Sequence, residues 1–192
     1  MKNQISDVTD KEYDKLIKRL EFFDTMRNNL LTFSFTAVLT VLGVAMTVDM
    51  DSKGSWICLI PFFLIIPFAA RISYYRLASA HINSFLKEFA QVDMGFERGT
   101  EDVPESICKG YKLLAWLVNH EMVLLGMATS CTFFFKYFIS IDGFKPRNCI
   151  GILVPVILTI IVYKISHSTY DYQELKTNFS VKWREYAAGK KI

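Results

Sequence analysis

The sequence predicts an all-α polytopic membrane protein with four transmembrane helices and cytoplasmic helical extensions. Three observations predict this fold class: the composition, four long apolar segments and the distribution of basic residues. Hydrophobic residues make up 52% of the 192 residues and charged residues only 21%, a balance that excludes a disordered chain. The net charge of +3 is too small to indicate a nucleic-acid-binding surface.

The apolar segments are the direct signal for membrane spans. Segment 30–48 contains no Asp, Glu, Lys, Arg or His, and a helix of that length crosses roughly 30 Å of hydrocarbon. Three further segments, at 56–70, 122–135 and 149–163, are extended by apolar flanking residues. Four such segments cannot all be buried inside a soluble fold of this size, so we interpret them as membrane spans.

The basic residues predict the orientation. Of the 22 Lys and Arg residues, 18 lie before the first span, between the second and third spans, or after the fourth span. The positive-inside rule therefore places both termini and the central segment in the cytoplasm. The predicted organisation is a cytoplasmic amphipathic helix at 1–29, a hairpin of two spans at 30–75, a cytoplasmic helical segment at 76–118, a second hairpin at 119–165 and a C-terminal cytoplasmic helix at 166–192.

The cytoplasmic segments carry helical apolar stripes. No Pro or Gly interrupts residues 10–42, so 10–48 predicts one rod roughly 58 Å long. The second rod is predicted to end at the turn residues of 93–104, where Pro104 suits the start of the next helix. A last stripe, ending before Gly189, consists of Tyr172, Leu175, Phe179, Trp183 and Tyr186. We expect these helices to pack together as a bundle or against neighbouring subunits.

Small and hydroxyl residues recur on one face of the first span. They follow steps of three and four residues and are Thr32, Thr36, Thr40, Gly43 and Thr47. Close helix packing explains such a face, because small residues let helix backbones approach. The threonines are equally candidates for lining a hydrated pore around a symmetry axis. Both interpretations involve oligomerisation.

Prolines and phenylalanines in the spans are candidates for gating. Pro61, Pro67 and Pro155 each remove a backbone donor and tend to kink a helix, either as static shape or as a hinge. Phe133 and Phe134 are candidates for a hydrophobic constriction, with helix or lipid packing as the alternative.

Cations beside aromatic rings are expected just below the membrane. This combination suits the recognition of phosphates and bases, and anchoring to anionic lipid headgroups predicts the same residue types. The candidate ligand-binding residues are Arg19, Arg27, Arg71, Tyr74, Tyr75, Arg76 and His81.

No catalytic or metal-binding motif is present in the sequence, so we predict neither an enzyme nor a bound cofactor or metal. His120 and Glu121, at the start of the third span, are a candidate proton relay or a simple interface feature. A small transporter is disfavoured because a second intramembrane carboxylate is missing.

Two stretches carry a family resemblance. They are YDKLIKRLEFFDTMRNNLL at 13–31 and RISYYRLA at 71–78, and they resemble the SLATT-like membrane effectors of prokaryotic conflict systems. The overall plan is similar to that of the small transmembrane effectors of anti-phage systems such as Hailong, which pair a membrane channel with a nucleotidyltransferase.

The resemblance implies a homo-oligomeric channel in the bacterial inner membrane, gated by a cytosolic nucleotide or oligonucleotide that a partner nucleotidyltransferase makes. Opening would depolarise the membrane on infection. The main alternative is a non-conducting membrane partner, whose cytoplasmic helices dock another protein. A small transporter is the third class.

Overall fold

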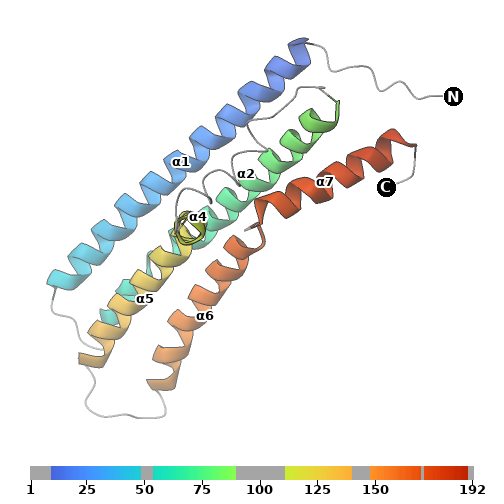
Figure 1. Cartoon of the computed structure of the whole chain (residues 1–192). Helices are drawn as coiled ribbons and strands as arrows, with labels where there is room; N and C mark the ends of the chain where they lie inside the picture. The colour runs from blue at the N-terminus through green and yellow to red at the C-terminus, as the bar shows by residue number, and fades with distance from the viewer. Residues whose placement is uncertain (1–9, 49–53, 90–110, 140–147, 170, 190–192) are drawn as a thin grey trace. The chain divides into compact units, whose positions relative to one another are not determined.

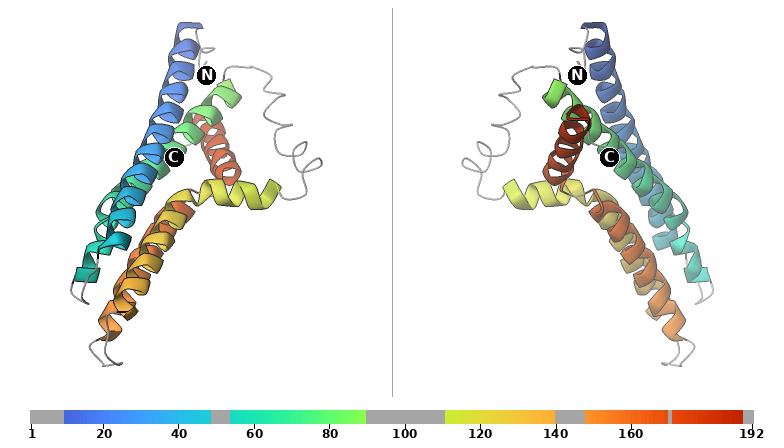
Figure 2. Two further views of the ribbon diagram at one scale, coloured as in Figure 1. Left: turned by 90° about the vertical axis from the view of Figure 1, so that its left-hand side faces the viewer. Right: turned by 90° about the vertical axis from the view of Figure 1, so that its right-hand side faces the viewer.

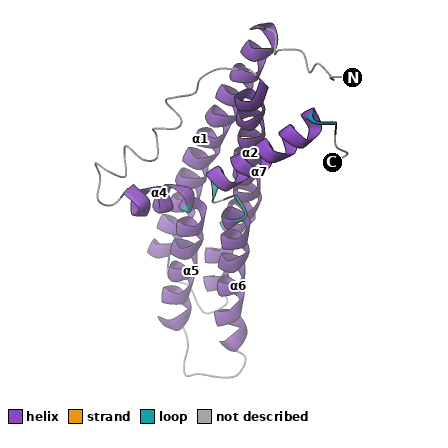
Figure 3. Ribbon diagram, turned by 45° about the vertical axis from the view of Figure 1, so that its right-hand side comes forward, coloured by secondary structure: helices purple, strands orange, loops and turns teal. Residues whose placement is uncertain are grey.

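The computed structural model describes residues 10–48, 54–89, 111–139, 148–169 and 171–189. Across these ranges the secondary structure is helical, and no strand occurs in them (Figure 3). Figure 1 shows the order of the elements, which are α1 (Asp10–Thr47), the short 3₁₀ helix η1 (Gly54–Leu59), α2 (Phe62–Phe89), α4 (Tyr111–Asn119), α5 (Glu121–Ile139), α6 (Asn148–His167) and α7 (Tyr172–Ala187).

Four helices are long and apolar enough to cross a membrane. They lie at Lys11–Thr47, Gly54–Phe89, Glu121–Ile139 and Cys149–His167. Each contains, to within one residue, one of the four apolar segments identified in the sequence, so the prediction of an all-α polytopic protein is confirmed.

Helix α1 is the single rod that the sequence predicts. Its 38 residues correspond to roughly 57 Å at 1.5 Å per residue. The helix passes through Gly43 without a break, because one glycine costs a helix only about 1 kcal/mol. The helix begins at Asp10, the first residue of the rod predicted over 10–48.

The second span begins differently from the prediction. Its first residues form η1, and Pro61 lies just before α2 rather than inside it. The Pro61 carbonyl accepts hydrogen bonds from the backbone N–H groups of Leu64 and Ile65, both at 2.9 Å. The expected kink at Pro61 is therefore wrong, because the missing N–H of a proline is harmless at a helix start. Pro67 and Pro155 do lie inside helices, α2 and α6 respectively.

The segment before the third span is interrupted by one residue. Helix α4 ends at Asn119 and α5 begins at Glu121, so His120 separates the two helices. The predicted turn at 93–104 and the helix start at Pro104 lie outside the described residues.

The chain divides into two compact units. The first consists of Met1–Met26, Tyr74–Val118 and Thr169–Ile192, and the second of Arg27–Ser73 and Asn119–Ser168. The four apolar segments fall mainly in the second unit, whose core includes Val38, Ile65 and Phe133, all fully buried. Helices α1 and α2 contribute residues to both units.

Within the second unit α5 and α6 run side by side (Figure 2). The Thr159 hydroxyl donates to the Pro155 carbonyl over 2.9 Å and also lies 2.9 Å from the hydroxyl of Ser130. A Cβ atom added to Gly151 would lie 2.5 Å from Cζ of the Tyr137 ring. Glycine at this position therefore permits the close approach of α6 to the Tyr137 ring.

Within the first unit aromatic rings join α7 to α2. The Trp183 ring is stacked on His81, with 5.1 Å between centroids and 10° between planes, and Phe85 approaches the same ring edge-on at 5.0 Å. Helix α7 ends as predicted, because Gly189 adopts φ 71°, which side-chain-bearing residues rarely adopt.

Polar contacts reinforce this pairing of helices. Nε and Nη2 of Arg184 each donate to the Glu88 carboxylate over 2.8 Å. At the other end of α7, Nδ2 of Asn83 donates to the Tyr172 hydroxyl over 2.6 Å. The Asp171 carboxylate caps α7 by accepting from the backbone N–H of Glu174.

Candidate functional site

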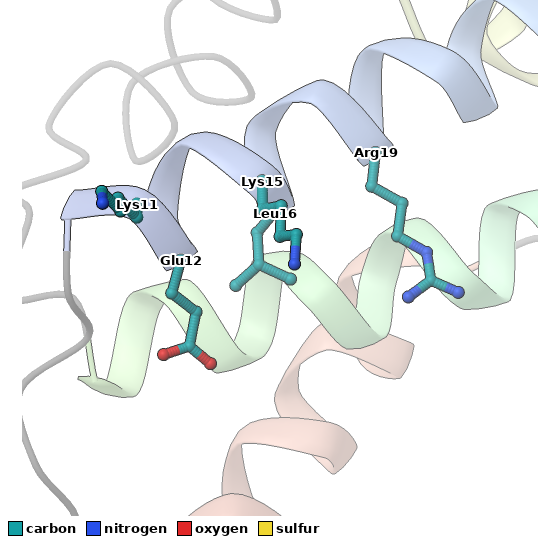
Figure 4. A pocket seen from close by; sticks show the side chains of 5 residues that line it. All are labelled: Lys11, Glu12, Lys15, Leu16 and Arg19. Atoms are coloured by element: carbon teal, nitrogen blue, oxygen red, sulfur yellow. The ribbon is translucent and has the colours of Figure 1, made fainter.

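A cavity lined by basic residues lies along the first turns of α1. Its volume is about 750 Å³, within the size range of ligand pockets. Among the described residues its walls are formed by Lys11, Glu12, Lys15, Leu16 and Arg19 (Figure 4). Glu12, Lys15, Leu16 and Arg19 project from the same side of α1 in this view.

Helical spacing places the three cations together. Lys11, Lys15 and Arg19 follow one another at four-residue steps, which align side chains along one helix face. All three are exposed, and of the described residues that line the cavity only Glu12 carries a carboxylate. The described lining therefore sums to two positive charges, a balance that favours an anion, and phosphate oxygens are suited to the donor groups of Lys and Arg.

An aromatic pair, Phe23 and Tyr75, lies next to Arg19, the last of the three cations. Cζ of Arg19 lies 5.6 Å from the centroid of the Phe23 ring, within range of a cation–π interaction. Phe23 is 6% exposed and is stacked on Tyr75 of α2, with 5.5 Å between centroids. The Arg19 guanidinium is thus held over a ring whose own position is fixed by packing.

The structure brings together only part of the predicted ligand-binding set. Arg19 lines the cavity and contacts the Phe23–Tyr75 pair, whereas Arg27 and Arg71 belong to the second unit. Tyr75 is buried in the stack on Phe23. Its side chain therefore packs α1 against α2.

The other members of that set have separate surroundings. His81 is stacked on Trp183, and its ring therefore takes part in holding α7 against α2. Tyr74 is 53% exposed and Arg76 is half-buried. Sequence reasoning missed Lys11 and Lys15, although their spacing from Arg19 was a readable signal.

The threonine face of α1 is exposed. Thr32, Thr36, Thr40, Gly43 and Thr47 are all accessible, and nothing lies within 4 Å of a Cβ added to Gly43. The buried face of the same helix consists of Ser34, Val38, Leu42 and Ala45. The threonine face is therefore free of close packing against the described residues of its own chain.

The threonine hydroxyls are bonded to their own helix. Thr36 donates to the carbonyl of Thr32 over 2.9 Å, Thr40 to that of Thr36 over 2.7 Å and Thr47 to that of Val44 over 2.9 Å. Each hydroxyl oxygen retains acceptor capacity toward the exterior of the helix. At these three positions the face is thus weakly polar, and the hydroxyl donors are satisfied.

The two candidate gate residues have different environments. Phe133 is fully buried, stacked on Tyr137 at 5.1 Å and approached edge-on by Trp56 at 5.5 Å. Phe134 is half-buried, and its ring lies 5.9 Å from that of Phe133. In this arrangement Phe133 packs inside the second unit.

His120 belongs to an aromatic group in the second unit. It is 1% exposed, and its ring lies 6.0 Å from that of Tyr163, which is stacked on His167 at 5.2 Å. Glu121 is half-buried at the first position of α5. Over the described ranges no group of three or more His, Cys, Asp or Glu residues is arranged to hold a metal ion.

Comparison of the chain with protein-family models, curated proteins and solved structures finds no match.

Proposed function

We propose that the chain forms a homo-oligomeric membrane channel whose opening is controlled by a cytosolic nucleotide or oligonucleotide. The observation that carries the proposal is the exposed threonine face of α1, inside a helix long and apolar enough to span a membrane. These hydroxyl groups lie on the outside of a single chain, so we infer that they contact something other than the core of that chain.

Cyclic assembly supplies such an environment. Copies related by a rotation axis along the membrane normal present the same face of α1 to that axis. Threonine oxygens offer passing ions weak, repeated contacts, which favour conduction over tight binding. Lys136, near the end of the third span, uses its ammonium group to bind backbone carbonyls at the end of α1.

The basic cavity supplies a place for an anionic ligand. It lies on the segment of α1 that the distribution of Lys and Arg assigns to the cytoplasm. Helix α1 is continuous from this cavity to the threonine face. A ligand that binds one conformation of the cavity more tightly than another shifts the equilibrium between closed and open states by that difference in affinity.

The biological setting of the proposal comes from the resemblance to anti-phage membrane effectors. We infer that the protein lies in a bacterial inner membrane, with both termini in the cytoplasm. A partner nucleotidyltransferase would produce the ligand on infection, and ion flow would depolarise the membrane.

Planar-bilayer recording of purified, size-defined oligomer tests the proposal. Nucleotides and short oligonucleotides are added to the side that carries the termini, and we expect discrete currents that change on addition. Folded, inserted protein that passes no current with any ligand, lipid or voltage would contradict the channel. The absence of current would favour the alternative, a non-conducting membrane protein that docks a cytosolic partner. A pull-down of cytosolic proteins would then test that alternative.

A further inference from the structure

A second cavity lies inside the membrane-spanning part of the chain. It has a volume of about 430 Å³ and lies between the start of the second span and α6, both within the second unit. Its lining includes Trp56, Ile60, Phe63 and Pro67 from the second span and Val154 and Leu158 from α6. Apart from the indole N–H of Trp56, no described lining side chain offers a hydrogen bond.

Trp56 marks the end of this cavity that faces the membrane–water interface. The Trp56 ring contacts Tyr137 edge-on at 6.5 Å, and the neighbouring Lys136 binds the terminal carbonyls of α1. Trp, Tyr and Lys at the ends of spans are typical of the interface. From this end the lining extends along α2 to Pro67, which is roughly 8 Å beyond Phe62 along the helix.

The wall of the cavity is preformed. Leu59 and Phe62 form part of it and are 7% and 2% exposed, so the core of the second unit fixes their positions. The rim is open, because Phe63 is 82% exposed and Ile60 is 50% exposed. An apolar chain that enters from the surrounding bilayer therefore meets a buried, packed surface at one side and exposed apolar side chains at the other.

The dimensions favour a thin occupant. An 8 Å length of α-helix with a diameter of roughly 10 Å fills about 630 Å³, which exceeds the volume of the cavity. An extended hydrocarbon chain is narrower and needs no hydrogen-bond partner. Because lipid tails are as apolar as the protein, binding of a hydrocarbon chain inside the bilayer is driven by close packing against the cavity wall.

We propose that this cavity binds one acyl chain of a phospholipid from the leaflet in which Trp56 lies. The chain lies against Phe62 and Leu158, with Phe63 over it, and its headgroup remains at the level of the Trp56 indole. The proposal depends on the membrane-spanning fold and is independent of whether the protein conducts ions.

Native mass spectrometry of the detergent-purified full-length protein tests the site, with a phosphatidylethanolamine of defined chain length added. We expect the parent protein to retain bound lipid, and Leu158→Trp, which fills the cavity, to lower its occupancy by roughly fivefold or more. Ile157→Trp is the matched control, because Ile157 is 51% exposed on the same helix and does not line the cavity. Equal lipid occupancy in the two variants, or no retained lipid in the parent, overturns the proposal.

Photo-crosslinking of the parent in vesicles provides a test that does not depend on a folded variant. The probe is a phosphatidylcholine with a diazirine in the middle of one acyl chain. We expect adducts to concentrate on peptides containing Phe63, Val154 and Leu158, over those from the exposed face of α1. An even distribution of adducts assigns the surface to general lipid contact, and crosslinks between protein copies at these peptides assign it to a second copy. Either result overturns the proposal.

Discussion

Lys136 binds the carboxyl end of a different span: its Nζ donates to the backbone carbonyl of Met46 over 2.9 Å. A second hydrogen bond, of 3.0 Å, joins the same Nζ to the carbonyl of Val48. The last carbonyls of a helix lack partners within the helix and carry partial negative charge. One ammonium group of α5 therefore satisfies the end of α1 and connects two spans that are 90 residues apart in the sequence.

Replacement of this ammonium should loosen α1 from α5. We expect Lys136→Met to lower the free energy of unfolding by about 1–2 kcal/mol, because hydrogen bonds to charged groups contribute about that much. Thermal unfolding in detergent measures the effect. Lys164→Met is the control, since Lys164 is exposed near the end of α6. Equal stability of the two variants would show that the Lys136 contacts contribute nothing measurable.

The threonine face predicts a selective loss of conductance. Thr36→Leu and Thr40→Leu replace hydroxyl groups with larger apolar side chains on an exposed face, so we expect a smaller single-channel current with unchanged assembly. Single-channel recording and sizing of the oligomer measure the two quantities. Met46→Leu serves as the control, because Met46 is exposed on the same helix and its replacement removes no hydroxyl group. A current equal to that of the parent would remove this face from the pore.

The basic cavity predicts where an anionic ligand acts. We expect Lys15→Ala and Arg19→Ala each to raise the ligand concentration needed for half-maximal channel response by about fivefold, the effect of losing roughly 1 kcal/mol of charge-assisted binding. Titration of the current with nucleotide measures this shift. Lys182→Ala removes the same charge from α7 outside the cavity and should leave the titration unchanged. If all three curves coincide, the cavity is not the ligand site.

The Glu88–Arg184 pair predicts an acid-sensitive association of α7 with α2. Glu88 lies 13 residues beyond Tyr75, outside the predicted span, and hydrogen bonds from Arg184 lower the pKa of Glu88 from its ordinary 4.5, against the opposing effect of partial burial. A carboxyl whose folded pKa is lowered stabilises the folded state above its ordinary pKa. This stabilisation is lost as the pH falls through the lowered value. Because the Arg184 side chain is 67% exposed, water screens the pair and the effect is small.

Amide hydrogen exchange of α7 measures that effect. We expect protection of α7 in the parent to fall as the pH drops below the ordinary carboxyl pKa of 4.5 and through the lowered pKa of Glu88. Glu88→Gln should give lower protection at neutral pH with a flatter pH dependence. Glu185→Gln is the control, because Glu185 pairs with Lys182 inside α7 itself. The same pH dependence in the parent and in Glu88→Gln would exclude this pair as its source.

Two glycines provide a matched test of packing in the second unit. We expect Gly151→Ala to lower the unfolding free energy by about 1–3 kcal/mol, because the new Cβ would meet the Tyr137 ring. Gly43→Ala should raise it by about 0.5–1 kcal/mol, since nothing obstructs a Cβ there and alanine favours the helix. Thermal unfolding in detergent compares the two. Equal changes in both variants would contradict the close approach at Gly151.

Local patterns in the sequence were sufficient to predict the extent of α1 and the end of α7. The absence of Pro and Gly before Gly43 predicted α1, and the apolar stripe before Gly189 predicted the end of α7. Local patterns did not predict the helix boundaries at Pro61 and His120. Pro61 is in an apolar run but starts a helix, and His120 separates two helices within a continuous apolar pattern.

The site was predictable only in part, because contacts between distant segments leave no periodic signal. Arg19 was identified from its charge and depth, but its contact with Phe23 depends on the packing of Phe23 against Tyr75. The stacking of His81 on Trp183 joins residues about one hundred positions apart. Neither contact can be inferred from the spacing of residues along one helix.

The hydrogen bonds of the α1 threonines bear on how the protein is made. Because the hydroxyls of Thr36 and Thr40 are already bonded to carbonyls one turn earlier, a newly synthesised α1 can leave the translocon singly without exposing an unsatisfied hydroxyl donor to lipid. For the proposed homo-oligomer, biogenesis would then separate into insertion of individual protomers and their later lateral association. Protomers would accumulate in the bilayer before their number suffices for that proposed assembly.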